Sequence, residues 1–148
     1  MAVTVALDTN IFINVKNREK PYYENSKKVL EAVDEGLVKA LISTIVLAEM
    51  CTGYYMFGDL KGKQEFLSYI LASPNYEIVQ VNAGIADLAG KIRAETYVRL
   101  PDAIIIASAI IKDAEAIVTH DDELRKAKSL IRILSAKDLI QKLPKTED

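Results

Sequence analysis

Short apolar runs alternate along this chain with longer segments in which apolar residues recur every three or four positions. The first run, Val3 to Leu7, is rich in β-branched residues and is typical of a strand buried on both faces of a sheet. The segment from Tyr22 to Glu35 has the spacing of an amphipathic helix, and Gly36 is placed to end it. The same patterns predict further strands at 39–42, 76–81, 116–119 and 131–134, and further helices at 45–57, 60–72, 83–98, 103–114 and 136–144.

Strands that alternate with helices predict a parallel sheet with helices on both of its faces. The fold class is therefore α/β, with five strands. A chain of 148 residues has the size of one ordinary domain. We expect this domain to span residues 1–144 and residues 145–148 to form a frayed tail.

Composition narrows the class of protein. Half of the residues are hydrophobic and 27% are charged, as in globular domains, and the net charge of -2 shows no excess of basic residues for binding nucleic acid. The single cysteine, Cys51, excludes an internal disulfide and fits a reducing compartment. The longest apolar run, Ala103 to Ile111, is shorter than a membrane span, and no signal-peptide pattern opens the chain. These features predict a cytoplasmic protein without membrane contact.

Two aspartates, Asp8 and Asp121, directly follow predicted strands, and a third, Asp102, stands at the start of an apolar helix. The carboxyl ends of parallel strands lie along one edge of a sheet, which is where open α/β sheets bind ligands. The residue types also allow a purely structural role: Asp8 can form a local turn, and Asp102 and Asp121 can cap helices.

Glu49 has no such structural role, because it lies in the middle of the predicted helix 45–57. Ile45 and Val46 precede it by four and three residues, so its side chain projects from or beside the apolar face. A lone carboxylate is costly to bury, and such groups are normally paired or bound to metal. This position favours a functional role for Glu49.

If the four acids lie close together, their negative charges repel one another. Two unit charges about 4 Å apart repel by about 4 kcal/mol at an effective dielectric constant near 20. No basic residue lies within two positions of any of the four acids, so a cation is needed to keep them ionised side by side. An all-oxygen ligand set suits Mg²⁺ or Mn²⁺, which can activate a water molecule and stabilise charge on a phosphate.

At four places the chain resembles the PIN-domain ribonucleases, and most closely the small VapC-type toxins. The resemblance covers essentially the whole chain, and its strength lies in the order and spacing of four short motifs, each weak alone. The motifs are Leu7-Asp8-Thr9-Asn10, Ala48-Glu49-Met50, Pro101-Asp102-Ala103 with the apolar residues that follow, and Val118-Thr119-His120-Asp121.

The resemblance implies a five-stranded parallel sheet, divalent-metal-dependent cleavage of single-stranded RNA, a homodimer and a VapB-type antitoxin partner. It implies that four acids bind the metal and catalyse, and that three polar residues support them through hydrogen bonds: Asp8, Glu49, Asp102 and Asp121 as ligands, with Thr9, Asn10 and Thr119 behind them. His120 departs from the family pattern, in which asparagine commonly precedes the fourth acid, and this leaves its supporting contact open.

Two other functions are compatible with parts of this pattern. A haloacid-dehalogenase-like phosphatase also has an aspartate after its first strand, but it needs a second acid two residues later, where this chain has Asn10. A PIN fold can also serve only as a binding module for RNA or protein, although the presence of all four acids argues against that role.

Overall fold

Five parallel strands form one sheet in the computed structural model, which describes residues 2–145. Their order across the sheet is β3-β2-β1-β4-β5, with β1 in the centre. The strands are β1 (Val3–Leu7), β2 (Val38–Ser43), β3 (Tyr76–Val79), β4 (Ala116–Val118) and β5 (Ile133–Leu134). The predicted five-stranded parallel sheet is confirmed. Of the predicted tail, residues 146–148 lie outside the described residues.

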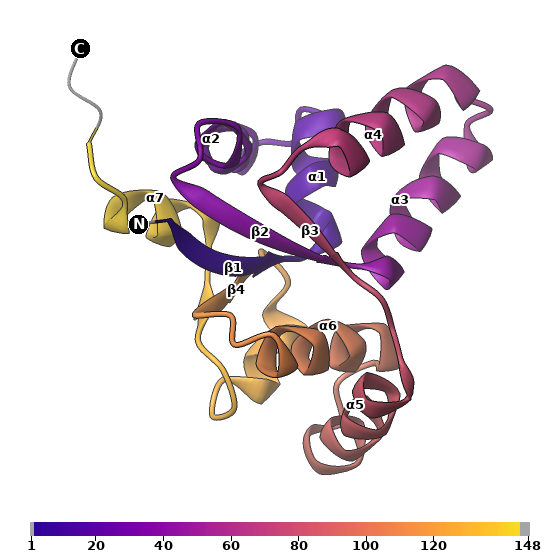
Figure 1. Ribbon diagram of the computed structural model, residues 1–148, viewed down its shortest axis with the longest axis vertical. Helices are drawn as coiled ribbons and strands as arrows, with labels where there is room; N and C mark the ends of the chain where they lie inside the picture. Colours follow the sequence, from indigo (N-terminus) through magenta and orange to yellow (C-terminus); the bar gives the residue numbers. More distant parts are fainter. Residues whose placement is uncertain (1, 146–148) are drawn as a thin grey trace.

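Helices cover both faces of the sheet, as expected for parallel strands joined by crossovers. Figure 1 shows α1 to α4 above the sheet and α5 and α6 below it. The helices are α1 (Thr9–Lys16), α2 (Tyr23–Asp34), α3 (Thr44–Met56), α4 (Leu60–Ala72), α5 (Ala83–Thr96), α6 (Leu100–Ile111), the 3₁₀ helix η1 (Asp122–Ala127) and α7 (Ala136–Lys142). No helix within residues 2–145 is long and apolar enough to span a membrane.

The core lies between the sheet and these helices. Val5, Ile42 and Ile117 on three neighbouring strands are fully buried, and each such side chain contributes about 1.5–3 kcal/mol relative to an exposed one. Helix α6 packs under the central strands and buries Ile106 completely, whereas Ile111 at its end is 44% exposed. Most of α6 is therefore buried, and its exposed apolar residues, Leu100 and Ile111, lie at its two ends.

Two differences from the sequence prediction concern acids: a helix that was not predicted follows Asp8, and α6 begins three residues earlier than expected. Residues 9–16 form α1, because the side chain of Asp8 accepts a hydrogen bond from the Thr9 amide and caps the helix. Helix α6 begins at Leu100, with Pro101 in its first turn, where a missing amide hydrogen costs nothing. Asp102 is thus inside the first turn of α6.

The register of the strands places their polar ends side by side. Leu7 of β1 pairs with Val118 of β4, and the Asp8 amide donates to the Val118 carbonyl oxygen at 3.1 Å. Asp8 and Thr119, which follow these paired residues, are therefore neighbours although 111 positions separate them. This edge of the sheet holds the candidate site.

Candidate active site

Three aspartates converge at the carboxyl edge of the sheet. Asp8 follows β1, Asp102 lies in the first turn of α6, and Asp121 lies between β4 and η1. One carboxylate oxygen from each lies within 4.8 Å of the other two. They line a cavity of about 370 Å³ to which Glu49 of α3 also contributes. The structure thus brings together elements that the sequence separates by more than a hundred residues.

Asp8 is held by three donors. Its Oδ1 accepts from the Thr9 amide at 2.8 Å, and its Oδ2 accepts from the Thr119 hydroxyl at 2.7 Å and from Asn10 Nδ2 at 3.0 Å. Asp8 is only 5% exposed. Thr119 and Asn10, to which the resemblance assigns a supporting role, thus both donate hydrogen bonds to this carboxylate.

The pKa of Asp8 is raised from 3.8 to about 6. Burial is the main cause, and the neighbouring charges of Asp102 and Glu49 add to it, while the hydrogen bonds from Thr119 and Thr9 oppose it. Burial likewise raises the pKa of Asp102, against the lowering effect of Arg99. The site favours a proton or another cation on these acids.

Glu49 reaches the same cavity but is not one of the three clustered acids. Its Oε1 accepts a hydrogen bond from the Thr9 hydroxyl at 2.7 Å, which connects α3 to the start of α1. The expectation that Glu49 is buried is wrong: the residue is exposed at the rim. Helix α3 is apolar on several sides, so its sequence pattern does not identify the covered face.

Arg99 is the site residue that sequence reasoning missed. It precedes α6, and its Nε and one terminal nitrogen each lie 3.1 Å from Oδ2 of Asp102. The same terminal nitrogen donates to Oδ2 of Asp121 at 2.7 Å. The spacing of three residues between Arg99 and Asp102 was the available signal, because side chains three apart on a helix are neighbours.

His120 does not line the carboxylate cavity, and its ring joins the loop that carries Asp121 to α1, α7 and Tyr22. Its Nδ1 lies 2.8 Å from Asn14 Oδ1, its Nε2 accepts from the Ala136 amide at 3.3 Å, and its ring stacks on Tyr22. Because Nε2 accepts, the proton is on Nδ1. Burial lowers the pKa of His120, in agreement with this neutral form. Its own amide donates to Asn10 Oδ1, so His120 anchors the loop that carries Asp121.

The donor set fits a hard divalent cation. Three carboxylates that share one small volume supply only oxygen ligands, and two of them, Asp8 and Asp102, are 5% exposed. Mg²⁺ and Mn²⁺ prefer such ligands, whereas structural zinc sites mostly use cysteine and histidine. A cation here would offset both the burial and the mutual repulsion that raise the pKa of Asp8.

Thr119 offers a test of this hydrogen-bond network. Its buried hydroxyl donates to Asp8 and accepts from Asn10 Nδ2 at 3.1 Å and from the Asp121 amide at 2.9 Å. Thr119→Val keeps the shape but leaves these groups without their partner, so we expect a loss of about 1–3 kcal/mol in the free energy of unfolding. Thr119→Ser keeps the hydroxyl and should lose less than about 1 kcal/mol. Urea denaturation measures both, and equal stability of the two variants would contradict the network.

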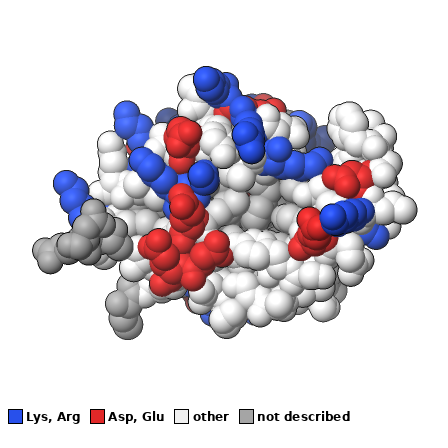
Figure 2. Space-filling model, turned by 90° about the horizontal axis from the view of Figure 1, so that it is seen from above, with Lys and Arg blue, Asp and Glu red and all other residues white. Residues whose placement is uncertain are grey.

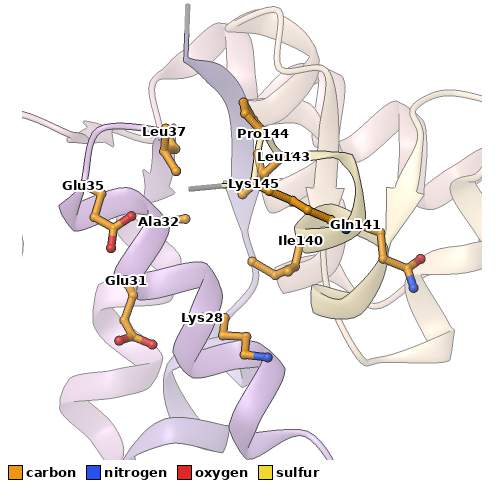
Figure 3. Close-up of a pocket in the computed structure, with 10 residues that line it drawn as sticks. All are labelled: Lys28, Glu31, Ala32, Glu35, Leu37, Ile140, Gln141, Leu143, Pro144 and Lys145. Atoms are coloured by element: carbon orange, nitrogen blue, oxygen red, sulfur yellow. The ribbon is translucent and has the colours of Figure 1, made fainter. Parts of the chain in front are cut away.

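A larger cavity of about 610 Å³ lies elsewhere, between α2 and the end of the chain (Figure 3). Lys28 and Glu31 of α2 and Glu35, which directly follows it, line one side, and Ile140 and Gln141 of α7 line the other. Leu37, which precedes β2, places this cavity at the amino ends of the strands. It is therefore at the opposite edge of the sheet from the three aspartates.

The face drawn in Figure 2 carries no sign of a nucleic-acid site in its charges. Figure 2 shows acidic and basic side chains next to one another on the face seen from above, without a broad basic area. With a net charge of -2, attraction for a polyanion is not a property of the whole surface. Any such attraction has to come from local groups and bound cations.

Comparison with known proteins identifies the same architecture. The PIN domain family model matches residues 5–130. The VapBC2 complex of Rickettsia felis, bound to a promoter DNA fragment, is 24% identical, with a TM-score of 0.68 over 90% of this chain and 98% of that chain.

A toxin-antitoxin complex from Klebsiella pneumoniae is 23% identical, with a TM-score of 0.67 over 89% of this chain and 97% of that chain. VapC20 of Mycobacterium tuberculosis, described as a Sarcin-Ricin loop cleaving toxin, is 16% identical, with a TM-score of 0.68 over 83% of this chain and 94% of that chain. A search of curated proteins gives no match. At these identities the solved structures show a shared fold.

Proposed function

Because this chain belongs to the PIN domain family, we propose that it is an endoribonuclease that cleaves single-stranded RNA with a divalent metal ion. The observation that carries the proposal is the convergence of Asp8, Asp102 and Asp121 within 4.8 Å. A binding module would gain nothing from the repulsion between these buried acids, whereas a metal-dependent hydrolase needs them.

In this proposal Asp8, Asp102 and Asp121 hold Mg²⁺ or Mn²⁺. When bound, the ion would lower the pKa of a water molecule and offset charge on the scissile phosphate. Asn10 and Thr119 fix the direction of the Asp8 carboxylate through their hydrogen bonds to Oδ2. Glu49, on the exposed rim, is placed to orient a water molecule with the carboxylate oxygen that Thr9 does not contact.

A small cavity beside the carboxylates is a reason to propose a single-stranded substrate. It has a volume of about 180 Å³ and shares Ile13 and Glu49 with the carboxylate cavity. Lys16 lies against it, with its Nζ 5.7 Å from the ring centre of the exposed Phe57. A cation beside an exposed aromatic ring suits a nucleotide whose base is unpaired, since the base can stack and its phosphate can contact the amine.

We further propose that the protein is the toxin of a VapBC-type pair. Structures with the same fold are described as a toxin-antitoxin complex from Klebsiella pneumoniae and as a member of the VapBC family of toxin-antitoxin systems from Mycobacterium tuberculosis. Apolar side chains that are exposed around the turn between α3 and α4 offer a surface for such an antitoxin or for a second copy of the chain: Tyr55, Met56, Phe57, Leu60 and, at the far end of α4, Leu71. Light scattering of the purified chain distinguishes the two possibilities, because a homodimer has twice the mass of the chain in the absence of any antitoxin.

Cleavage of a fluorescent single-stranded RNA tests the activity. We expect the wild-type protein to cleave with Mn²⁺ or Mg²⁺ and to stop when EDTA is added. Asp102→Asn should remove the activity, because it replaces one of the clustered carboxylates. Cleavage that survives EDTA or this substitution would refute the metal site, and a folded wild-type protein that is inactive with every metal and RNA tested would favour the binding module.

A further inference from the structure

Arg99 joins two of the three clustered acids. Its guanidinium contacts Oδ2 of Asp102 at 3.1 Å and Oδ2 of Asp121 at 2.7 Å, and these acids come from different elements. Among the described residues (2–145), Arg99 is the only basic one that lines the carboxylate cavity. No basic residue lies within two positions of the acids in the sequence. In the folded chain Arg99, which is outside the four motifs, provides a positive charge beside them.

The exposed fractions of these three side chains show that the guanidinium of Arg99 lies on the solvent side of the two carboxylates. The side chain of Asp102 is 7% exposed and that of Asp121 is 32% exposed, whereas that of Arg99 is 64% exposed. The carboxylates are fixed by the fold, but the arginine lies over them from the solvent side. It can leave by rotation of its own side chain, without a change in the backbone or the core.

A divalent cation held by the three aspartates and this guanidinium would compete for the same two carboxylates, those of Asp102 and Asp121. Mg²⁺ binds carboxylate oxygens at about 2.1 Å and demands near-octahedral geometry, so its ligands cannot also surround a guanidinium on the same side. Two cations that share so small a volume also repel each other. The contacts of Arg99 are thus alternatives to metal ligation, and their loss is part of what metal binding costs.

We propose that Arg99 is a resident counter-cation, which occupies Asp102 and Asp121 until a divalent ion displaces it and so sets the ion concentration at which the site fills. This inference rests on the proposed metal-dependent function. Arg99 acts here as a positioning residue that holds Asp102 and Asp121 close together before metal binds.

The test compares Mn²⁺ binding by the wild-type protein and by Arg99→Gln, measured by isothermal titration calorimetry at low ionic strength. Removal of the competing cation should lower the Kd for Mn²⁺ by about tenfold. Arg125→Gln is the matched control, because Arg125 forms an exposed ion pair with Asp122 at 3.5 Å and does not line the carboxylate cavity. Its Kd should stay within about twofold of the wild-type value.

Melting of the metal-free proteins provides a second measurement. Without metal, Arg99→Gln should melt at a lower temperature than Arg125→Gln, since Asp102 and Asp121 lose their ion pairs with Arg99; with saturating Mn²⁺ this difference should disappear. A Kd that rises in Arg99→Gln would mean that Arg99 helps to hold the metal, and an unchanged Kd would mean a simple surface ion pair. Either result overturns the inference and leaves the proposed nuclease intact, whereas wild-type protein that binds no Mn²⁺ would refute both.

Discussion

Replacement of Asp8 by asparagine should remove RNA cleavage and yet make the metal-free protein more stable at neutral pH. Loss of a residue that hydrogen-bonds to a metal ligand typically lowers metal affinity or activity by about 10- to 100-fold. Loss of a ligand itself should therefore lower the activity by more than about 100-fold. Stability should rise because the folded protein no longer has to ionise a buried carboxylate.

The size of this gain follows from the pKa of Asp8. Its rise from 3.8 to about 6 corresponds to about 3 kcal/mol at pH 7. Asparagine cannot accept all the hydrogen bonds from Thr9, Asn10 and Thr119, and the one or two that are lost cost about 1 kcal/mol each. The net expectation is a gain of about 1 kcal/mol in the free energy of unfolding.

Urea denaturation and the RNA cleavage assay together measure both effects. The matched control is Asp122→Asn, a neighbouring acid whose side chain is 97% exposed, and it should change neither stability nor activity appreciably. An Asp8→Asn protein that is both inactive and clearly less stable would show that Asp8 is mainly a structural helix cap.

Divalent metal should produce the second large effect, a rise in melting temperature that depends on pH. At a Mn²⁺ concentration about 100 times the Kd, binding adds about 2.7 kcal/mol, which corresponds to about 8 °C for a chain of this size. Because the ion binds the ionised acid, this rise should be large at pH 7.5 and small at pH 5, below the pKa of Asp8 near 6.

The metal-free protein should show the opposite trend. The unfolded chain loses the Asp8 proton near pH 4, whereas the folded protein keeps it to about pH 6. Asp8 therefore lowers the free energy of unfolding as pH rises from 4 to 6 and has no further effect above that. Differential scanning fluorimetry with Mn²⁺ or EDTA across this range measures both trends, and a metal effect that is independent of pH would exclude Asp8 as a ligand.

Much of the fold could be predicted from the sequence because local patterns and long-range packing agree. Helix α4 begins and ends at the predicted residues, and α5 and α7 begin at the predicted residues 83 and 136, where Asn82 and Ser135 cap them. The convergence of Asp8, Asp102 and Asp121 was also predictable, since parallel strands necessarily present their carboxyl ends at one edge.

The rest depends on contacts that periodicity does not encode. Helix α1 was missed because Asp8, Thr9 and Asn10 are turn formers whose side chains cap and brace a helix once the sheet has placed them. The exposed position of Glu49 depends on which sides of α3 are covered by its neighbours. Arg99 was overlooked because its link to Asp121 spans 22 residues and exists only in the folded chain.

The most direct test of a metal-dependent nuclease at Asp8, Asp102 and Asp121 is a parallel titration with Mn²⁺. Electron paramagnetic resonance measures bound Mn²⁺, and cleavage of single-stranded RNA is followed in the same samples. The account predicts that binding and cleavage rise over the same concentration range and that both are lost in Asp102→Asn. Cleavage by metal-free protein, or Mn²⁺ binding that is unchanged in Asp102→Asn, would contradict it.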